Sequence, residues 1–362
     1  MQSALAGETW DFGGYVKNRL AHSHTVYPAG ERYTEDFNRL RLELRGRPWP
    51  GVAIEVQYDN EIVLGSYLDT QQFQVQKNLP RPTYWDAQAT YADTRDLYGE
   101  HLLHRAAVTW SGDNVDVRIG RQRIAWGTGR FFSALDRLNP FSPTSLERAE
   151  RPGVDALLVE FRPGALSRAS AVVAPQRAAG GSTRVLRWHA NAGAADYSLM
   201  AGRFRGEEVA GADLATQVGS AGLRAELAAI RTAGRLHERA LVGMDQAFAG
   251  GLTLGAEIYL DGTGAARSSD YDFAALFAGE RQTVGRRYLG AYAGYEITPL
   301  LKLNVDLIFN LRDRSRYLAP SLTWSLRPNL EAVLGTQWFA GRAGSEYGAF
   351  KDLYFVQLQW YF

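Results

Sequence analysis

The last ten residues, Leu353-Tyr354-Phe355-Val356-Gln357-Leu358-Gln359-Trp360-Tyr361-Phe362, contain the most informative pattern of the chain. Every even-numbered residue from Tyr354 to Phe362 is large and apolar, whereas Gln357 and Gln359 lie between them. Alternation with a period of two predicts a β-strand that has one apolar face. The chain therefore ends on a strand whose apolar face carries the aromatic residues Trp360 and Phe362.

The same alternation recurs along the chain of 362 residues. In 36–45, three leucines alternate with charged residues, and in 301–311 the apolar Val305 and Leu307 alternate with Asn304 and Asp306. A soluble sandwich also alternates. However, charged residues on one face of strand after strand favour a wall that is apolar outside and polar inside. This pattern predicts an all-β fold, a transmembrane antiparallel β-barrel that forms a single domain over residues 1–362.

The strand count follows from the spacing of turns. Both ends of such a chain normally lie on the periplasmic side, which requires an even number of strands, short periplasmic turns and long extracellular loops. Eighteen strands satisfy this if 206–232 holds two strands, and sixteen is the alternative. We expect strands at 9–20, 34–46, 52–64, 101–111, 115–126, 154–162, 167–176, 184–193, 195–205, 208–219, 222–232, 238–248, 252–262, 287–296, 301–311, 315–326, 329–339 and 352–362.

Composition is consistent with a barrel and excludes several other classes. Mean hydropathy is −0.27 and no apolar run is long enough for a membrane helix. The net charge of +1 argues against a nucleic-acid partner. There is no Cys, and the 40 basic residues include only four Lys, a bias that codon usage or the binding of carboxylates and phosphates by Arg would explain. The first residues lack the features of a signal peptide, so we expect a mature chain.

Two motifs resemble porin-like barrels of Gram-negative outer membranes. They are Ile119-Gly120-Arg121-Gln122-Arg123-Ile124-Ala125-Trp126-Gly127 and Leu138-Asn139-Pro140-Phe141, and the similarity covers about 115–161. The resembling group includes the alginate-export type of eighteen-stranded barrel. The resemblance implies the outer membrane, with its lipid and lipopolysaccharide, as location. The terminal residues Trp360 and Phe362 resemble the signal that the barrel-assembly machinery recognises.

The strand register assigns charged residues to the barrel interior. Eight basic and nine acidic groups predict a lumen with weak overall ion selectivity. An alternative is that these charges only pair across strands and stiffen the wall. The predicted pore-lining residues are Arg39, Arg41, Glu43, Arg45, Glu55, Asp59, Asp116, Arg118, Glu160, Arg162, Arg187, Arg224, Glu226, Asp245, Glu257, Lys302 and Asp306.

The long segment 127–153 is the candidate constriction loop. It carries charges of both signs, and its residues Phe131, Phe132 and Phe141 favour a buried position. It would then fold into the lumen and narrow it, whereas the alternative is an outer loop bonded to neighbouring loops or to lipopolysaccharide. The charged residues that would set the selectivity of a constriction are Arg130, Asp136, Arg137, Arg148 and Arg151.

No pattern predicts an enzyme, a metal site or a cofactor. His22 with His24, and His101 with His104, lack the neighbouring ligands of a metal site. We therefore expect a passive channel for small hydrophilic solutes. Two alternatives remain open: a conduit that exports a polysaccharide or another polymer with a periplasmic partner, and a closed structural barrel.

Overall fold

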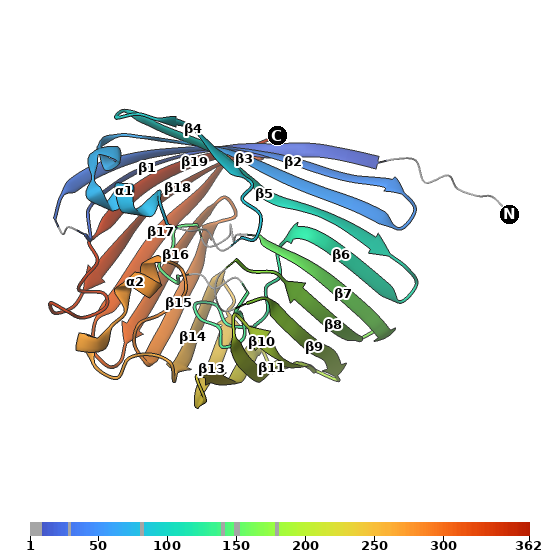
Figure 1. Ribbon diagram of the computed structural model, residues 1–362. Coiled ribbons are helices and arrows are strands. Elements are labelled where there is room, and N and C mark those ends of the chain that lie inside the picture. Colours follow the sequence, from blue (N-terminus) through green and yellow to red (C-terminus); the bar gives the residue numbers. More distant parts are fainter. Residues whose placement is uncertain (1–8, 28–29, 80–82, 139–141, 148–152, 178–180) are drawn as a thin grey trace.

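In the computed structural model, β-strands form a closed antiparallel barrel (Figure 1). The structure describes residues 9–27, 30–79, 83–138, 142–147, 153–177 and 181–362. The sheet has nineteen strands, of which all except β4 follow one another around the ring, so that the barrel has eighteen. The strands are β1 (Thr9–His24), β2 (Arg32–Trp49), β3 (Val52–Leu64), β4 (Gln88–Asp93), β5 (Leu97–Ser111), β6 (Val115–Gln122), β7 (Val154–Gly164), β8 (Ser167–Ala174), β9 (Thr183–Ala192), β10 (Ala195–Phe204), β11 (Glu207–Val218), β12 (Ala221–Thr232), β13 (Arg235–Ala247), β14 (Leu252–Asp261), β15 (Arg287–Thr298), β16 (Leu301–Asn310), β17 (Arg316–Arg327), β18 (Leu330–Ala340) and β19 (Leu353–Tyr361).

The barrel closes where its last strand meets its first. β19 pairs antiparallel with β1, and Tyr15 lies opposite Tyr361. Beyond the strand, the amide of Gly14 donates to the Phe362 oxygen at 3.0 Å, and the Phe362 amide donates back to Gly14 at 3.1 Å. The eighteen-stranded barrel predicted from the alternation is therefore confirmed, including the two strands in 206–232, β11 and β12.

The two ends of the barrel differ. The turns at one end, beside the N-terminal end of β1, are all short. The longer segments lie at the other end, together with the short turns 205–206 and 233–234, and Figure 1 shows α1 (Gln71–Gln76) and α2 (Phe273–Phe277) there. Two short 3-10 turns, Ser66–Asp69 and Ser268–Asp270, precede these helices. No helix among the described residues is long and apolar enough to cross a membrane.

The outer face of the wall is apolar. On β19 the side chains of Tyr354, Val356, Leu358 and Trp360 are all 45–51% exposed. On β1, Val16 and Leu20 are similarly exposed, while Lys17 and Arg19 between them are turned to the other face and buried. Exposed aliphatic and aromatic rows of this kind suit contact with lipid rather than with water.

Strand β4 was not predicted, and β6 ends earlier than predicted. β6 ends at Gln122 instead of residue 126, and so it pairs only with the C-terminal part of β5. The N-terminal part of β5, Tyr98–Leu102, pairs with β4 on the side that β6 leaves free. β4 thus continues the line of β6, and the chain after Gln122 is released to leave the wall.

An ion pair between β6 and β7 also holds the segment that precedes β4. Arg121 Nε lies 2.9 Å from Asp155 Oδ1, which connects the end of β6 with the start of β7. Arg121 also donates to the Leu103 carbonyl at 2.9 Å, and the Trp85 amide donates to Asp155 at 2.8 Å. Both charged side chains are buried, so the segment that leads into β4 is fixed to the wall.

Candidate functional site: the barrel interior

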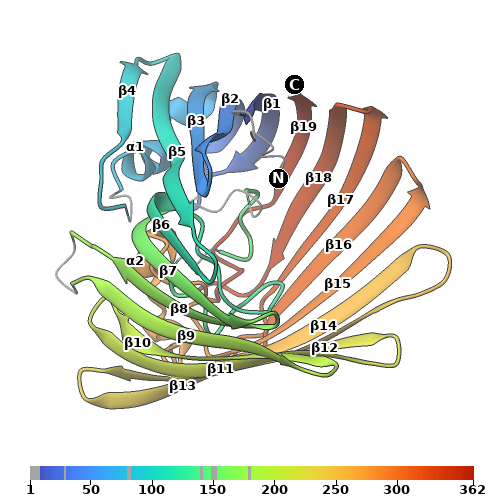
Figure 2. The same ribbon diagram turned by 90° about the vertical axis from the view of Figure 1, so that its right-hand side faces the viewer.

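The segment that follows β6 lies inside the ring (Figure 2). It turns at Gly127, where the backbone has φ +112° and an added Cβ would lie 2.2 Å from Ser133 Oγ, so that only glycine fits. Phe131 and Phe132 are completely buried. The Phe132 ring stacks on Tyr259 of β14 at a centroid distance of 4.9 Å. The described part of the segment therefore packs against the inner side of the wall.

Two carboxylates of the wall hold this segment by its backbone. Glu257 of β14 accepts hydrogen bonds from the amides of Arg130, Phe131 and Phe132 at 2.7–3.0 Å. Glu226 of β12 binds the segment on both sides of these three residues. Its partners are the amides of Thr128, Gly129, Ala134 and Leu135 and the hydroxyl of Ser133.

A buried carboxylate normally needs several donors, and backbone amides provide them here. Glu226 and Glu257 are each 3% exposed. These two residues, predicted to line the pore, lie on the predicted face, but their charge is directed at the loop.

A basic cluster, defined as Lys17 and Arg19 of β1 with Arg39 of β2, lies on the other side of the ring. All three side chains contact Glu147 of the same loop, at 3.1, 2.6 and 2.8 Å respectively. Burial opposes ionisation of Glu147, but the three cations outweigh it and lower the pKa of Glu147 to about 2. Glu147 is therefore ionised at neutral pH and anchors the loop to β1 and β2.

The basic cluster is itself neutralised by the wall. Arg39 Nη2 lies 2.8 Å from Glu61 Oε1. Next to the cluster, Arg41 makes a bidentate pair with Asp59, with distances of 2.5 and 2.6 Å. Such bidentate pairs have a fixed geometry. The wall therefore presents alternating charges rather than a block of one sign.

The remaining predicted pore-lining residues also lie on the strand face opposite the exposed apolar rows. Most of them are paired within the wall, which fits the expected balance of charge. The ion pairs are Arg45–Glu43, Arg118–Glu55, Arg162–Asp116, Arg187–Asp213, Arg224–Asp245, Arg168–Glu160 and Lys302–Glu296.

The residues proposed for the constriction have different positions. Arg130 lies over the Tyr292 ring at 3.9 Å and is 3.4 Å from Asp306. Arg137 pairs with Glu207 of β11, and Asp136 is buried. Arg148 and Arg151 lie outside the described residues, as does the Asn139-Pro140-Phe141 part of the motif.

Sequence reasoning did not predict Lys17 and Arg19 as lumen residues, nor the contacts that Glu147 makes from the charged loop. The two basic residues alternate with the outward-facing Val16 and Leu20 in a strand that was predicted, so the alternation alone would have placed them inside. Glu147 carried no such signal. Its partners on β1 and β2 are more than 100 residues away in the sequence, and only the folded loop brings them together.

The fold defined by these features is that of the outer-membrane porins. Among solved structures, the chain is similar to the outer membrane protein OpdK from Pseudomonas aeruginosa, with 11% identity over 98% of both chains and a TM-score of 0.63. It is also similar to OccK9 (OpdG) from Pseudomonas aeruginosa, with 14% identity over 97% of this chain and 98% of that chain and a TM-score of 0.64.

A third structure of the same fold comes from another organism. OccAB2 from Acinetobacter baumannii has 10% identity over 98% of both chains and a TM-score of 0.60. No protein-family profile and no curated protein sequence matches the chain. At such low identity, the structural likeness establishes the architecture.

Proposed function

We propose that the chain is an outer-membrane channel for passive diffusion of small hydrophilic solutes. The observation that carries this proposal is the path of the loop. It is anchored to Glu226 on β12 and Glu257 on β14, and again through Glu147 to β1 and β2. These strands lie on opposite sides of the ring in Figure 2. A loop that crosses the ring in this way narrows the lumen.

The wall supports the same function. Its outer face is apolar, which suits the bilayer, and its inner face carries paired charges, which suit water. Within the narrowed region, the predicted lumen charges and Arg130 would contact passing solutes. Because acidic and basic groups alternate, weak selectivity between small anions and cations is expected.

The size class of solute is suggested by one similar structure. OpdK has also been solved with vanillate, a small aromatic carboxylate. On this ground we propose solutes of similar size for this chain. Delivery to the membrane would depend on the barrel-assembly machinery, through the terminal aromatic residues Trp360 and Phe362.

Vesicle swelling tests this function. Purified protein is reconstituted into vesicles, which are diluted into isotonic solutions of a pentose, a disaccharide or a tetrasaccharide. We expect rapid swelling with the pentose and progressively slower swelling with the larger sugars. Vesicles that contain heat-denatured protein are the control. Swelling rates equal to this control for every solute would reject a diffusion channel.

A further inference from the structure

A groove of about 640 Å³ runs over the lipid-facing side of the wall. It crosses β1, β2 and β16–β19, where small outward residues lie between larger ones. The groove lies over the small side chains of Pro320 and Thr336. It is bordered by Leu20, Leu334 and Val356, and these three residues are 45–59% exposed. A hollow with an apolar lining on this face suits a hydrocarbon chain.

A second pocket of about 610 Å³ lies at the upper end of this groove. The two share His22 and Tyr354. The upper pocket is formed by the tops of β1 and β2 and by the segment 341–352, and it contains the cations Arg32 and Lys351, both exposed. With the described residues, neither of these cations makes an ion pair within 4.0 Å.

The pocket has a single acidic lining residue, Asp352. One of its oxygens is occupied, since Asp352 Oδ1 accepts a hydrogen bond from the Phe339 amide at 2.9 Å. Two cations and two histidines therefore face this pocket against one carboxylate. Such a pocket attracts an anion with several oxygen acceptors, as a phosphate is.

We propose that the groove and the upper pocket together bind a phosphorylated glycolipid of the outer leaflet. An acyl chain would lie in the groove, and a phosphate of the head group would contact Arg32 and Lys351. The pocket lies at the end of the barrel that carries the long segments, which is the outer end of such a barrel. This inference rests on the outer-membrane location in the proposed function.

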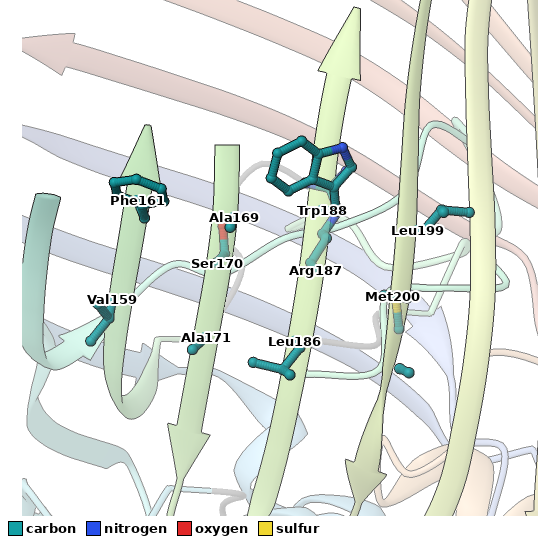
Figure 3. Close-up of a pocket in the computed structure, with 11 residues that line it drawn as sticks. Val159, Phe161, Ala169, Ser170, Ala171, Leu186, Arg187, Trp188, Leu199 and Met200 are labelled. Atoms are coloured by element: carbon teal, nitrogen blue, oxygen red, sulfur yellow. The ribbon is translucent and has the colours of Figure 1, made fainter. Parts of the chain in front are cut away.

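The wall provides an internal comparison. A groove of about 480 Å³ over β7–β10 is also apolar and is lined by Phe161, Leu186, Trp188 and Leu199 (Figure 3). Its only charged lining residue is Arg187, which is turned to the lumen and lies 3.2 Å from Asp213. This groove can take a hydrocarbon chain, but it lacks cations for a phosphate.

Binding of lipid A, a phosphorylated and acylated disaccharide, tests the proposal. Purified protein in detergent is titrated with lipid A, and the bound lipid is counted by native mass spectrometry. The double variant Arg32→Gln, Lys351→Gln should bind lipid A about tenfold more weakly or worse, because two head-group contacts are lost. Leu334→Trp, which fills the groove, should weaken binding as well.

The control is Leu199→Trp, which fills the groove over β7–β10 and should leave lipid A binding unchanged. Unchanged binding in both test variants would overturn the proposal. Inorganic phosphate that binds as tightly as lipid A would overturn the assignment to a lipid. Vesicle swelling by the same variants separates the two questions. Intact swelling with unaltered lipid binding rejects only the lipid site, whereas absent swelling in wild-type protein rejects only the channel.

Discussion

At the scale of single residues, Glu346 is a deeply buried ionisable group in the outer segments. It is 2% exposed, and it accepts hydrogen bonds from Tyr288 at 2.7 Å and from Asn310 at 2.8 Å. Burial outweighs these hydrogen bonds and raises the pKa of Glu346 to about 7. The carboxyl group connects the segment 341–352 with the ends of β15 and β16, so its protonation bears on the order of this segment.

The raised pKa of Glu346 predicts stability that falls as pH increases. Between pH 4.5 and 7, Glu346 loses its proton in the unfolded chain but keeps it in the folded chain. The free energy of unfolding therefore decreases as the pH rises through this range. Above about pH 7 the stability contributed by protonated Glu346 is lost completely. We expect a lower urea midpoint at pH 8 than at pH 5, and a free energy of unfolding that is lower by about 1–3 kcal/mol. Glu346→Gln should remove most of this difference.

The control for this experiment is Glu31→Gln, which alters a carboxylate elsewhere in the outer segments. It should retain the dependence on pH of the wild-type protein. Equal dependence on pH in Glu346→Gln and the wild type would contradict the assignment.

A second prediction tests which face of β16 contacts lipid. Val305 and Leu307 lie on the outer face and Asn304 on the inner face. Val305→Arg and Leu307→Arg should each destabilise the folded protein in a bilayer by about 2–4 kcal/mol, because charge is costly near the midplane. Asn304→Arg, the matched control, should be tolerated. Folding yields in vesicles measure the effect, and equal yields for all three variants would refute the register.

Most inward-facing residues could be predicted, because alternation depends only on near neighbours. A residue such as Arg41 faces inward whatever its partner is. Its bidentate pairing with Asp59 depends on the register between β2 and β3, which the sequence leaves open. The contacts of Glu147 depend on the path of a long loop and could not be predicted from any local pattern.

At the scale of elements, the loop after β6 is held by hydrogen bonds from its backbone to carboxylates of the wall, rather than by secondary structure of its own. Each carboxylate of Glu226 and Glu257 binds several backbone amides, so the position of the loop depends on these two side chains. Phe131 and Phe132 add buried apolar contacts. If both carboxylates were neutral amides, the acceptors would be fewer and weaker.

The double variant Glu226→Gln, Glu257→Gln should therefore loosen the loop. We expect larger current fluctuations and a higher mean conductance in planar bilayers, with the barrel still folded. Glu160→Gln is the control, since the hydrogen bond and ion pair of Glu160 are to Ser170 and Arg168 of β8. A double variant that conducts with the noise and mean current of the control would show that these carboxylates do not hold the loop.

The elements themselves were largely predictable from the alternation, but β4 was not. Its six residues, Gln88–Asp93, are too few and too exposed to show a clear alternation. It forms because β6 ends at Gln122 and leaves one edge of β5 unpaired. The early end of β6 in turn follows from the loop turning inward, which is a tertiary event.

At the scale of the whole molecule, the chain end closes the ring and also carries the expected assembly signal. Phe362 lies beyond β19 and exchanges two hydrogen bonds with Gly14. These bonds are few compared with the whole pairing of β1 with β19, in which eight residue pairs face each other. Loss of Phe362 should thus affect the fold less than it affects recognition of the chain by the barrel-assembly machinery.

Deleting Phe362 should reduce the amount of protein in the outer membrane of cells. Folding of the purified variant into detergent should change much less, because the strand pairing remains. Phe362→Tyr keeps an aromatic end and serves as the control, with membrane levels near those of the wild type. Undiminished membrane levels after the deletion would contradict a role of Phe362 in assembly.

The central claim is that the barrel is a channel narrowed by the loop after β6. Single-channel recording in a planar bilayer, on the wild type and on a variant lacking residues 128–138, tests it most directly. We predict discrete open steps for the wild type and clearly larger steps for the variant. Wild-type protein that folds but never conducts would contradict the channel, and equal steps for both proteins would contradict the constriction.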